Sequence, residues 1–203
     1  MTDSDIAVAL KGFVSRVYPD MSIAVTLAND GSGRREIYFI EERFRNLYPL
    51  QRYHCIQHLI PEEFCVDQMR DAVWFECAPG EDPADLTFPD DQLVVDITPD
   101  VLRVLRQCGF FEKMDATMCA VAEQAGAPRC AGDFSVAKKI LSDCGRPEDE
   151  FFDVFHVLMD QGAYCDCEIP FNVMEESNLK ERYWQQRGLT SGCTCRRATG
   201  PGY

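Results

Sequence analysis

The chain has 203 residues, with 34 acidic side chains against 20 basic ones and a formal net charge of −14. At 46% hydrophobic and 27% charged residues, its composition is that of an ordinary folded chain, long enough for one large domain or two small ones. The acidity argues against nucleic acid or an anionic membrane surface as a partner, because both bind clustered lysine and arginine.

The cysteines and the start of the chain point to a compartment. Eleven cysteines cannot all pair within one chain, and such scattered cysteines are typical of thiols in a reducing environment. Asp3 and Asp5 stand where a signal peptide has a basic start, and no stretch approaches the roughly 20 apolar residues of a membrane span. We therefore expect a cytoplasmic protein that does not span a membrane.

The acidic side chains are unevenly distributed. Residues 60–100 hold twelve acidic side chains and a single basic one, Arg70. Beyond Leu179 the sign reverses to a net +4. The acidic stretch is either a solvated surface that keeps the protein soluble or a docking surface for a basic protein partner, since complementary potentials steer association.

The first part of the chain predicts a helix and a β-hairpin. Apolar residues recur at helical spacing over residues 3–18, and Pro19 follows. Residues 23–27 alternate as a half-buried strand does. Residues 36–40 form the returning strand beyond a turn of Asn, Asp, Gly and Ser at 29–33.

A second helix and a third strand complete an N-terminal α/β unit over residues 1–80. The helix is predicted over residues 50–59, with Pro61 closing it, and the strand over residues 72–77. The following segment, residues 81–96, is acidic, and Pro79, Gly80, Pro83 and Pro89 lie in or just before it. We predict that it links two units.

A mostly helical unit is predicted over residues 97–187. Thr98 caps its first helix, with Pro99 in the first turn and Gly109 at the end. Three helices, an extended segment and a last helix then follow, at residues 115–125, 133–144, 147–161, 164–173 and 177–186. Residues 188–203 are rich in Gly, Ser, Thr and Arg, and we predict that they form a mobile tail. The fold class is α+β: an α/β unit of helix, β-hairpin, helix and strand, then a helical unit with a short extended Cys-x-Cys segment.

The feature best suited to chemistry is Cys165-Asp166-Cys167. In an extended segment residues i and i+2 point to the same side, so the two sulfurs can converge on one ion. Zinc takes four tetrahedral nitrogen or sulfur ligands, sometimes with an oxygen. The other candidate ligands, all in the same predicted unit, are Cys130, Asp133, Cys144 and His156.

Three interpretations of these cysteines stay open: buried structural thiols, a zinc-type site of Cys130, Cys165 and Cys167, or a redox pair. The Cys-x-Cys spacing is tighter than the usual Cys-x-x-Cys of zinc sites. A second pair, Cys193 and Cys195, lies in the predicted tail, where it either completes a metal site or is incidental. The remaining cysteines fall on apolar faces or helix ends and are assigned to packing: Cys55, Cys65, Cys77, Cys108 and Cys119.

Residues 162–173, Gly-Ala-Tyr-Cys-Asp-Cys-Glu-Ile-Pro-Phe-Asn-Val, resemble an uncharacterised bacterial family, domain of unknown function 2695. Its members have an upstream cysteine followed closely by a polar residue, a helix, and a Gly-Tyr-Cys-Asp-Cys-Glu segment that runs into Asn-Val. Residues 128–175 carry the likeness, with Ala163 where a second glycine is common and Pro170 interrupting the apolar run. The matching positions are Cys130, Asp133, Tyr164, Cys165, Asp166, Cys167, Glu168, Asn172 and Val173. The resemblance supports the site and implies no activity.

Residues 44–54, with the strand from Asp71 and the Pro-x-Asp segment at 83–85, are similar to the BolA-type α/β fold. The resemblance implies helix, hairpin, helix and strand in that order, and work with glutaredoxins on iron–sulfur clusters. Arg52 of the family's Arg-His pair is kept. Tyr53 stands in place of its histidine, and Asp71 stands where the histidine ligand is expected.

Signs of catalysis are few. The sequence has no Gly-x-Ser-x-Gly elbow, no Walker loop and no Gly-x-Gly-x-x-Gly fingerprint. His54 and His58 share a helix face at a spacing of four, but the glutamate of a zinc protease motif is missing between them. We expect a partly exposed pair without a catalytic role.

Three functional hypotheses follow. The preferred one is a non-enzymatic binding or regulatory protein with a structural zinc-type site in its helical unit. The second is an acidic inhibitor or adaptor that binds a basic protein through residues 60–100. The third is an enzyme that uses Cys165 or Cys167 as a nucleophile or redox thiol.

Overall fold

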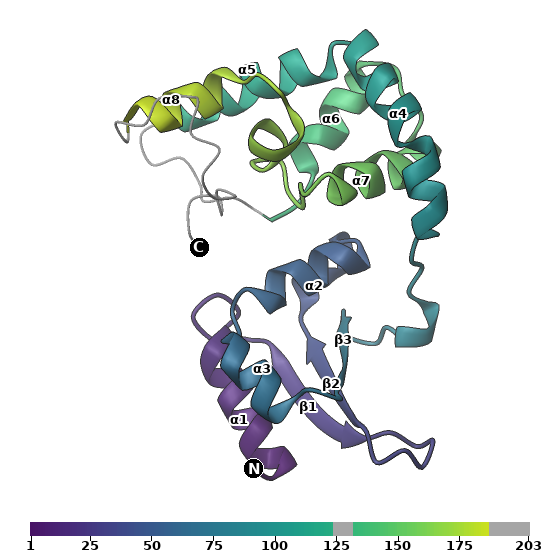
Figure 1. Cartoon of the computed structure of the whole chain (residues 1–203), viewed down its shortest axis with the longest axis vertical. Coiled ribbons are helices and arrows are strands. Elements are labelled where there is room, and N and C mark those ends of the chain that lie inside the picture. Colours follow the sequence, from purple (N-terminus) through teal and green to yellow (C-terminus); the bar gives the residue numbers. More distant parts are fainter. Residues whose placement is uncertain (124–131, 187–203) are drawn as a thin grey trace. The chain divides into compact units, whose positions relative to one another are not determined.

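The computed structural model describes residues 1–123 and 132–186, which belong to two compact units (Figure 1). Unit 1 runs from Met1 to Phe88 and unit 2 begins at Pro89, so the boundary falls inside the predicted linker. Unit 1 combines helices with a three-stranded sheet, whereas the regular elements described in unit 2 are helical. The predicted α+β class is confirmed.

Unit 1 keeps the predicted order of helix, hairpin, helix and strand and adds a helix before the last strand. Its elements are α1 (Asp3–Val14), β1 (Ser22–Leu27), β2 (Arg35–Ile40), the 3-10 turn η1 (Glu42–Asn46), α2 (Pro49–Gln57), α3 (Glu62–Gln68), β3 (Val73–Cys77) and the 3-10 turn η2 (Pro83–Asp85).

The sheet has β2 at its centre, antiparallel to β1 and parallel to β3. Ile37 pairs with Trp74 and Phe39 pairs with Glu76, so these four residues share one face. Ile37 and Phe39 are fully buried there among residues of α1 and α2. Because parallel strands need a crossover connection, α2 and α3 both lie between β2 and β3 along the chain.

Helix α1 begins with a capping box. The Thr2 hydroxyl accepts from the backbone N–H of Asp5 (3.2 Å), and the Asp5 carboxylate accepts from that of Thr2 (2.9 Å). The helix ends at Val14, short of the predicted residue 18, where a final turn brings the backbone N–H of Tyr18 to the Val14 carbonyl (2.8 Å). Its buried residues are Ile6, Leu10 and Val14.

Helix α3 was not predicted, because Pro61 was expected only to end the preceding helix. Pro61 instead stands at the N-cap of α3, where its missing N–H costs no helical hydrogen bond. Phe64 of α3 packs edge to face on Phe13 of α1, with ring centroids 5.2 Å apart, and the two helices lie side by side (Figure 1).

The described part of unit 2 contains five α-helices and two short helical turns. They are α4 (Asp91–Gln107), α5 (Phe110–Glu123), α6 (Ser135–Asp143), the 3-10 turn η3 (Glu148–Glu150), α7 (Phe151–Asp160), the π-helical turn η4 (Ile169–Val173) and α8 (Asn178–Gln186). The Phe134 and Phe155 rings stack in its core, with centroids 4.6 Å apart and planes at 10°.

The start of α4 differs from the prediction. Thr98 was expected to cap the helix, but α4 begins at Asp91, where the Asp90 carboxylate accepts from the backbone N–H of Leu93 (3.0 Å). The helix continues through Pro99, and the Thr98 hydroxyl donates back to the Val94 carbonyl (2.7 Å). Much of the predicted linker is therefore helical.

The Cys-x-Cys segment is not extended, as had been predicted for residues 164–173. Cys165 begins a turn in which the backbone N–H of Glu168 donates to its carbonyl (3.1 Å), and η4 follows directly. A chain reversal rather than a strand therefore places the two cysteines.

Candidate functional site

The Cys-x-Cys segment follows the end of α7. Gly162 adopts a left-handed conformation (φ 86°), which a residue with a side chain would adopt only with strain. The backbone N–H of Ala163 donates to the Leu158 carbonyl (2.9 Å), and the Asn172 amide donates to the Gly162 carbonyl (2.6 Å). The segment therefore leaves α7 in a fixed direction.

Asp166 anchors the segment to the start of α6. Its carboxylate, 6% exposed, accepts from the backbone N–H groups of Val136 (2.8 Å) and Ala137 (2.9 Å). Its own N–H donates to the Asp133 carbonyl (2.9 Å). A carboxylate at a helix N-terminus also interacts favourably with the helix dipole. The central residue of Cys-Asp-Cys thus serves as a helix cap supplied from a distant part of the chain.

The two sulfurs lie together. Cys165 Sγ and Cys167 Sγ are 3.0 Å apart, with Cys165 only 1% exposed and Cys167 half-buried. Two thiolates on one zinc ion lie about 3.8 Å apart, given tetrahedral Zn–S bonds of about 2.3 Å. A shared zinc ion would therefore need the two side chains to separate by less than about 1 Å.

The other predicted ligands do not assemble into a set of three within the described residues. Asp133 accepts through Oδ1 from the backbone N–H of Ser135 (3.1 Å). His156 is buried on α7 with Nδ1 2.7 Å from the Phe152 carbonyl oxygen, and burial lowers its pKa. Across residues 1–123 and 132–186, no three His, Cys, Asp or Glu side chains are placed to hold a metal ion. Cys130, Cys193, Cys195 and the predicted tail lie outside the described residues.

The pair of His54 on α2 and His58 at its C-cap is partly exposed, as predicted. His58 Nε2 lies 3.2 Å from His54 Nδ1, which brings the two rings edge to face. Of the cysteines assigned to packing, Cys77 and Cys119 are buried, and Cys55 and Cys65 contact the core of unit 1.

Unit 1 contains a buried ionic cluster that the sequence did not reveal. Arg52 on α2 is 4% exposed and donates to the carbonyls of Leu47 and Glu76 (both 3.0 Å). Its guanidinium also forms a bidentate ion pair with the Glu81 carboxylate: Nη1 donates to Oε2, and Nη2 donates to Oε1 (3.1 Å). This hydrogen bond holds the pKa of Glu81 below its usual range. One guanidinium thus joins α2, β3 and the loop beyond β3.

Glu76 is the second unexpected group. It lies on the inner face of β3 opposite Phe39, 8% exposed, and its Oε1 has no hydrogen-bond partner. Burial raises the pKa of this carboxyl to about 7, against weaker opposing effects of its backbone and Arg52. Strand alternation places Glu76 on the same face as Trp74, and that signal was available in the sequence.

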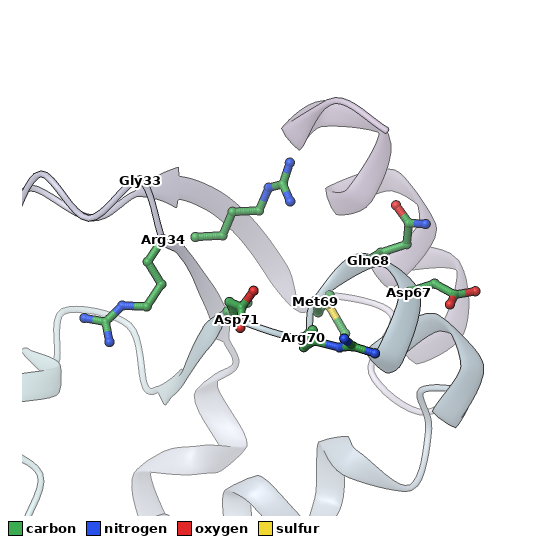
Figure 2. Close-up of a pocket in the computed structure, with 9 residues that line it drawn as sticks. Gly33, Arg34, Asp67, Gln68, Met69, Arg70 and Asp71 are labelled. Atoms are coloured by element: carbon green, nitrogen blue, oxygen red, sulfur yellow. The ribbon is translucent and has the colours of Figure 1, made fainter.

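A hollow of about 230 Å³ lies where the β1–β2 turn faces the connection from α3 to β3 (Figure 2). Three arginines border it, but Arg34 pairs with Asp30 (3.2 Å) and Arg35 with Asp3 (2.9 Å). Figure 2 shows the side chains of Arg34 and Arg70 directed away from each other. The basic groups do not converge on one point, and we assign no ligand here.

The acidic stretch divides between both units and between different roles. Glu76 is buried, and Glu81 forms an ion pair with Arg52. Asp82 caps the short turn η2, and Asp90 caps the long helix α4. The side chains that remain at the surface without such a role include Glu62, Glu63, Asp67, Asp71, Asp85 and Asp91.

No family model matches the chain, and no curated protein is significantly similar to it. In the part of the chain that the structure describes, no helix is both long and apolar enough to cross a membrane.

Proposed function

We propose that the chain is a non-enzymatic binding or regulatory protein whose helical unit is stabilised by a zinc-type ion at Cys165 and Cys167, with Cys130 as a third thiolate. The observation that carries the proposal is the pair of sulfurs 3.0 Å apart on a segment that Asp166 fixes to α6. Metal–thiolate bonds there would tie α6 and α7 together, as structural zinc sites do in small domains.

A structural role is favoured over catalysis by how the polar side chains of the segment are used. Asp166 caps α6, Glu168 accepts from the backbone N–H of Tyr164 (2.7 Å), and Asn172 binds the Gly162 carbonyl. Each is engaged with backbone, so none is placed to move a proton to or from a substrate. Cys165 is also too deeply buried to attack one.

Metal analysis of protein purified without chelator tests the proposal. We expect close to one equivalent of zinc, lost in Cys165→Ser and in Cys167→Ser. Cys77→Ser, at an equally buried cysteine of unit 1, is the matched control and should keep its metal. Less than about half an equivalent of any metal in the wild-type protein, or equal loss in the control, would contradict the site.

A second candidate function, docking of a basic protein, rests on the exposed acids of the acidic stretch. Charge reversal should be made at Asp67, Asp71 and Asp85, since Glu81 is committed to Arg52 and its replacement would disturb the fold. A lysine-rich peptide is the probe. The triple variant should bind it more weakly than a control reversed at three exposed acids of unit 2, which are Asp149, Glu175 and Glu176. Equal weakening would mean general attraction without a dedicated surface.

A further inference from the structure

Two helices of unit 2 end in the same way, at a cysteine followed by a glycine. Cys108 is the C-cap of α4 and Cys144 that of α6, and Gly109 (φ 69°) and Gly145 (φ 73°) then turn the chain away. Neither cysteine belongs to the Cys-x-Cys segment. The α4 and α6 ends that they mark meet next to the first turn of α5.

The two cysteines are in contact. The Cys144 thiol donates a hydrogen bond to the Cys108 carbonyl oxygen (3.4 Å), which places the two residues next to each other. Cys108 also donates to the Leu105 carbonyl (3.3 Å). Both side chains are half-buried, so a small molecule can reach them from solvent. They are 36 positions apart in sequence, which makes their contact a product of the fold.

Lys113 makes the two sulfurs chemically different. Its exposed ammonium lies 3.2 Å from Cys144 Sγ, and this hydrogen bond raises the pKa of Lys113, so the positive charge persists at neutral pH. A neighbouring cation favours the thiolate form of a cysteine. Burial, together with Cys144, raises the pKa of the Cys108 thiol, which therefore stays protonated until it reacts. Because the Lys113 ammonium contacts the sulfur of Cys144, we assign Cys144 as the attacking thiol and Cys108 as the resolving one.

We propose that Cys108 and Cys144 form a reversible redox site that reacts with low-molecular-weight disulfides of the glutathione type. The Cys144 thiolate attacks one sulfur of the disulfide, whose S–S bond breaks and releases one glutathione thiolate that takes up a proton. Cys108 then loses its proton to solvent and attacks the Cys144 sulfur, which expels the second glutathione. Two protein thiols are oxidised to one disulfide, and one small-molecule disulfide is reduced to two thiols.

The experiment treats the full chain with oxidised glutathione, blocks the remaining thiols and digests the protein with trypsin and a glutamyl endopeptidase together. Cys108 then lies in the peptide 107–112 and Cys144 in 140–148, separate from Cys165 and Cys167. We expect a disulfide-linked pair of these peptides that reduced glutathione reverses. Cys108→Ser should stop at a stable glutathione adduct on Cys144.

Lys113→Met separates an activated thiol from a merely accessible one. Loss of the ammonium 3.2 Å from Cys144 Sγ should slow exchange about threefold, because the attacking thiolate loses its neighbouring cation. Cys55→Ser, which removes a half-buried cysteine of unit 1, is the matched control and should leave the linked peptides unchanged.

Two outcomes would overturn the proposal. One is oxidation spread evenly over the cysteines, with no excess of the Cys108–Cys144 pair. The other is faster alkylation of Cys108 than of Cys144 in the untreated wild-type protein, a measurement that needs no variant. Neither outcome involves the oxidation state of Cys165 and Cys167, where the metal is proposed, so the two proposals fail separately.

Discussion

The two units are each held together by buried charge, but of opposite sign. In unit 1 the cation Arg52 donates to two carbonyls and to the Glu81 carboxylate. In unit 2 two anions accept from backbone N–H groups: Asp166 at the start of α6, and Asp115 of α5 at the start of α8, where it bonds to Ser177 and Asn178. Carbonyls without a backbone partner are acceptors, so a buried cation satisfies them. Helix N-termini present free N–H donors and the positive end of the helix dipole, so an anion satisfies them.

The difference extends to pH. Glu76 of unit 1 has a raised pKa, so its protonated form is the one that the fold favours. Burial raises the pKa of Asp115 in unit 2, but its hydrogen bonds with Ser177, Leu179 and Asn178 outweigh burial and leave it below its ordinary 3.8. As the pH falls, protonation of Glu76 should therefore stabilise unit 1 in mild acid. Protonation of Asp115 should destabilise unit 2 in strong acid.

The largest expected effect is at Arg52. Arg52→Met should destabilise unit 1 by about 3–5 kcal/mol, because it leaves the Glu81 carboxylate without its counter-ion and two carbonyls without their guanidinium donor. Urea unfolding of the full chain, followed by Trp74 fluorescence in a Trp184→Phe background, reports on unit 1 alone. Arg52→Lys keeps the charge without the two-pronged geometry and should lie in between. A loss below about 1 kcal/mol would show that the guanidinium is not central to unit 1.

Glu76 gives the next effect. Its carboxyl binds a proton in the folded state up to about pH 7, against an ordinary pKa of 4.5. Its contribution is therefore complete below about pH 4.5 and is lost as pH rises through 7, to a total of about 3 kcal/mol. Glu76→Gln should remove this dependence and stabilise unit 1 at pH 8. Parallel stability curves for the two proteins between pH 4 and pH 8 would contradict it.

Asp115 should act in the opposite direction. Asp115→Ala leaves the start of α8 without its acceptor and should cost about 2 kcal/mol at pH 7. Since the pKa of Asp115 is lowered, its stabilisation is present above about pH 4 and is lost as pH falls further. Trp184 fluorescence in a Trp74→Phe background follows this end of unit 2. A difference in unfolding free energy between wild type and variant that grows as the pH falls would contradict this prediction.

The smallest expected effect tests whether a charged side chain must be buried, and not merely paired, to contribute to stability. Arg103 and Asp100 on α4 form an ion pair at 2.7 Å with side chains 57% and 76% exposed. Arg103→Ala should change the stability of unit 2 by less than about 0.5 kcal/mol. A change as large as that of Asp115→Ala would remove the distinction between surface and buried charge.

Periodicity predicted most elements, because the pattern of apolar residues depends on local geometry. The hairpin, β3, α2 and α5–α8 occur near their expected positions. Proline was the main source of error. Pro61 was taken as the end of one helix although it also opens α3, and Pro99 was taken as a helix start although α4 runs through it. Proline fixes one dihedral, and the same angle suits several positions.

The site was harder to predict than the fold. That Cys165 and Cys167 lie together was expected, but for the wrong reason, since a turn and not a strand brings them together. Cys108 was assigned to packing, and its contact with Cys144 joins the ends of two helices that no local pattern relates. Arg52 was noticed only for a family resemblance, because its burial depends on Glu81, which follows it along the chain beyond α3 and β3.

The parallel pairing of β2 with β3 has a consequence for synthesis on the ribosome. The β1–β2 hairpin is complete once Ile40 has emerged, but its other edge must wait for β3, after α2 and α3 have been made. Glu81, the counter-ion of Arg52, emerges later still. A nascent chain that stops before Glu81 would have to bury a guanidinium without its carboxylate. Unit 1 should therefore fold only after translation has passed this loop.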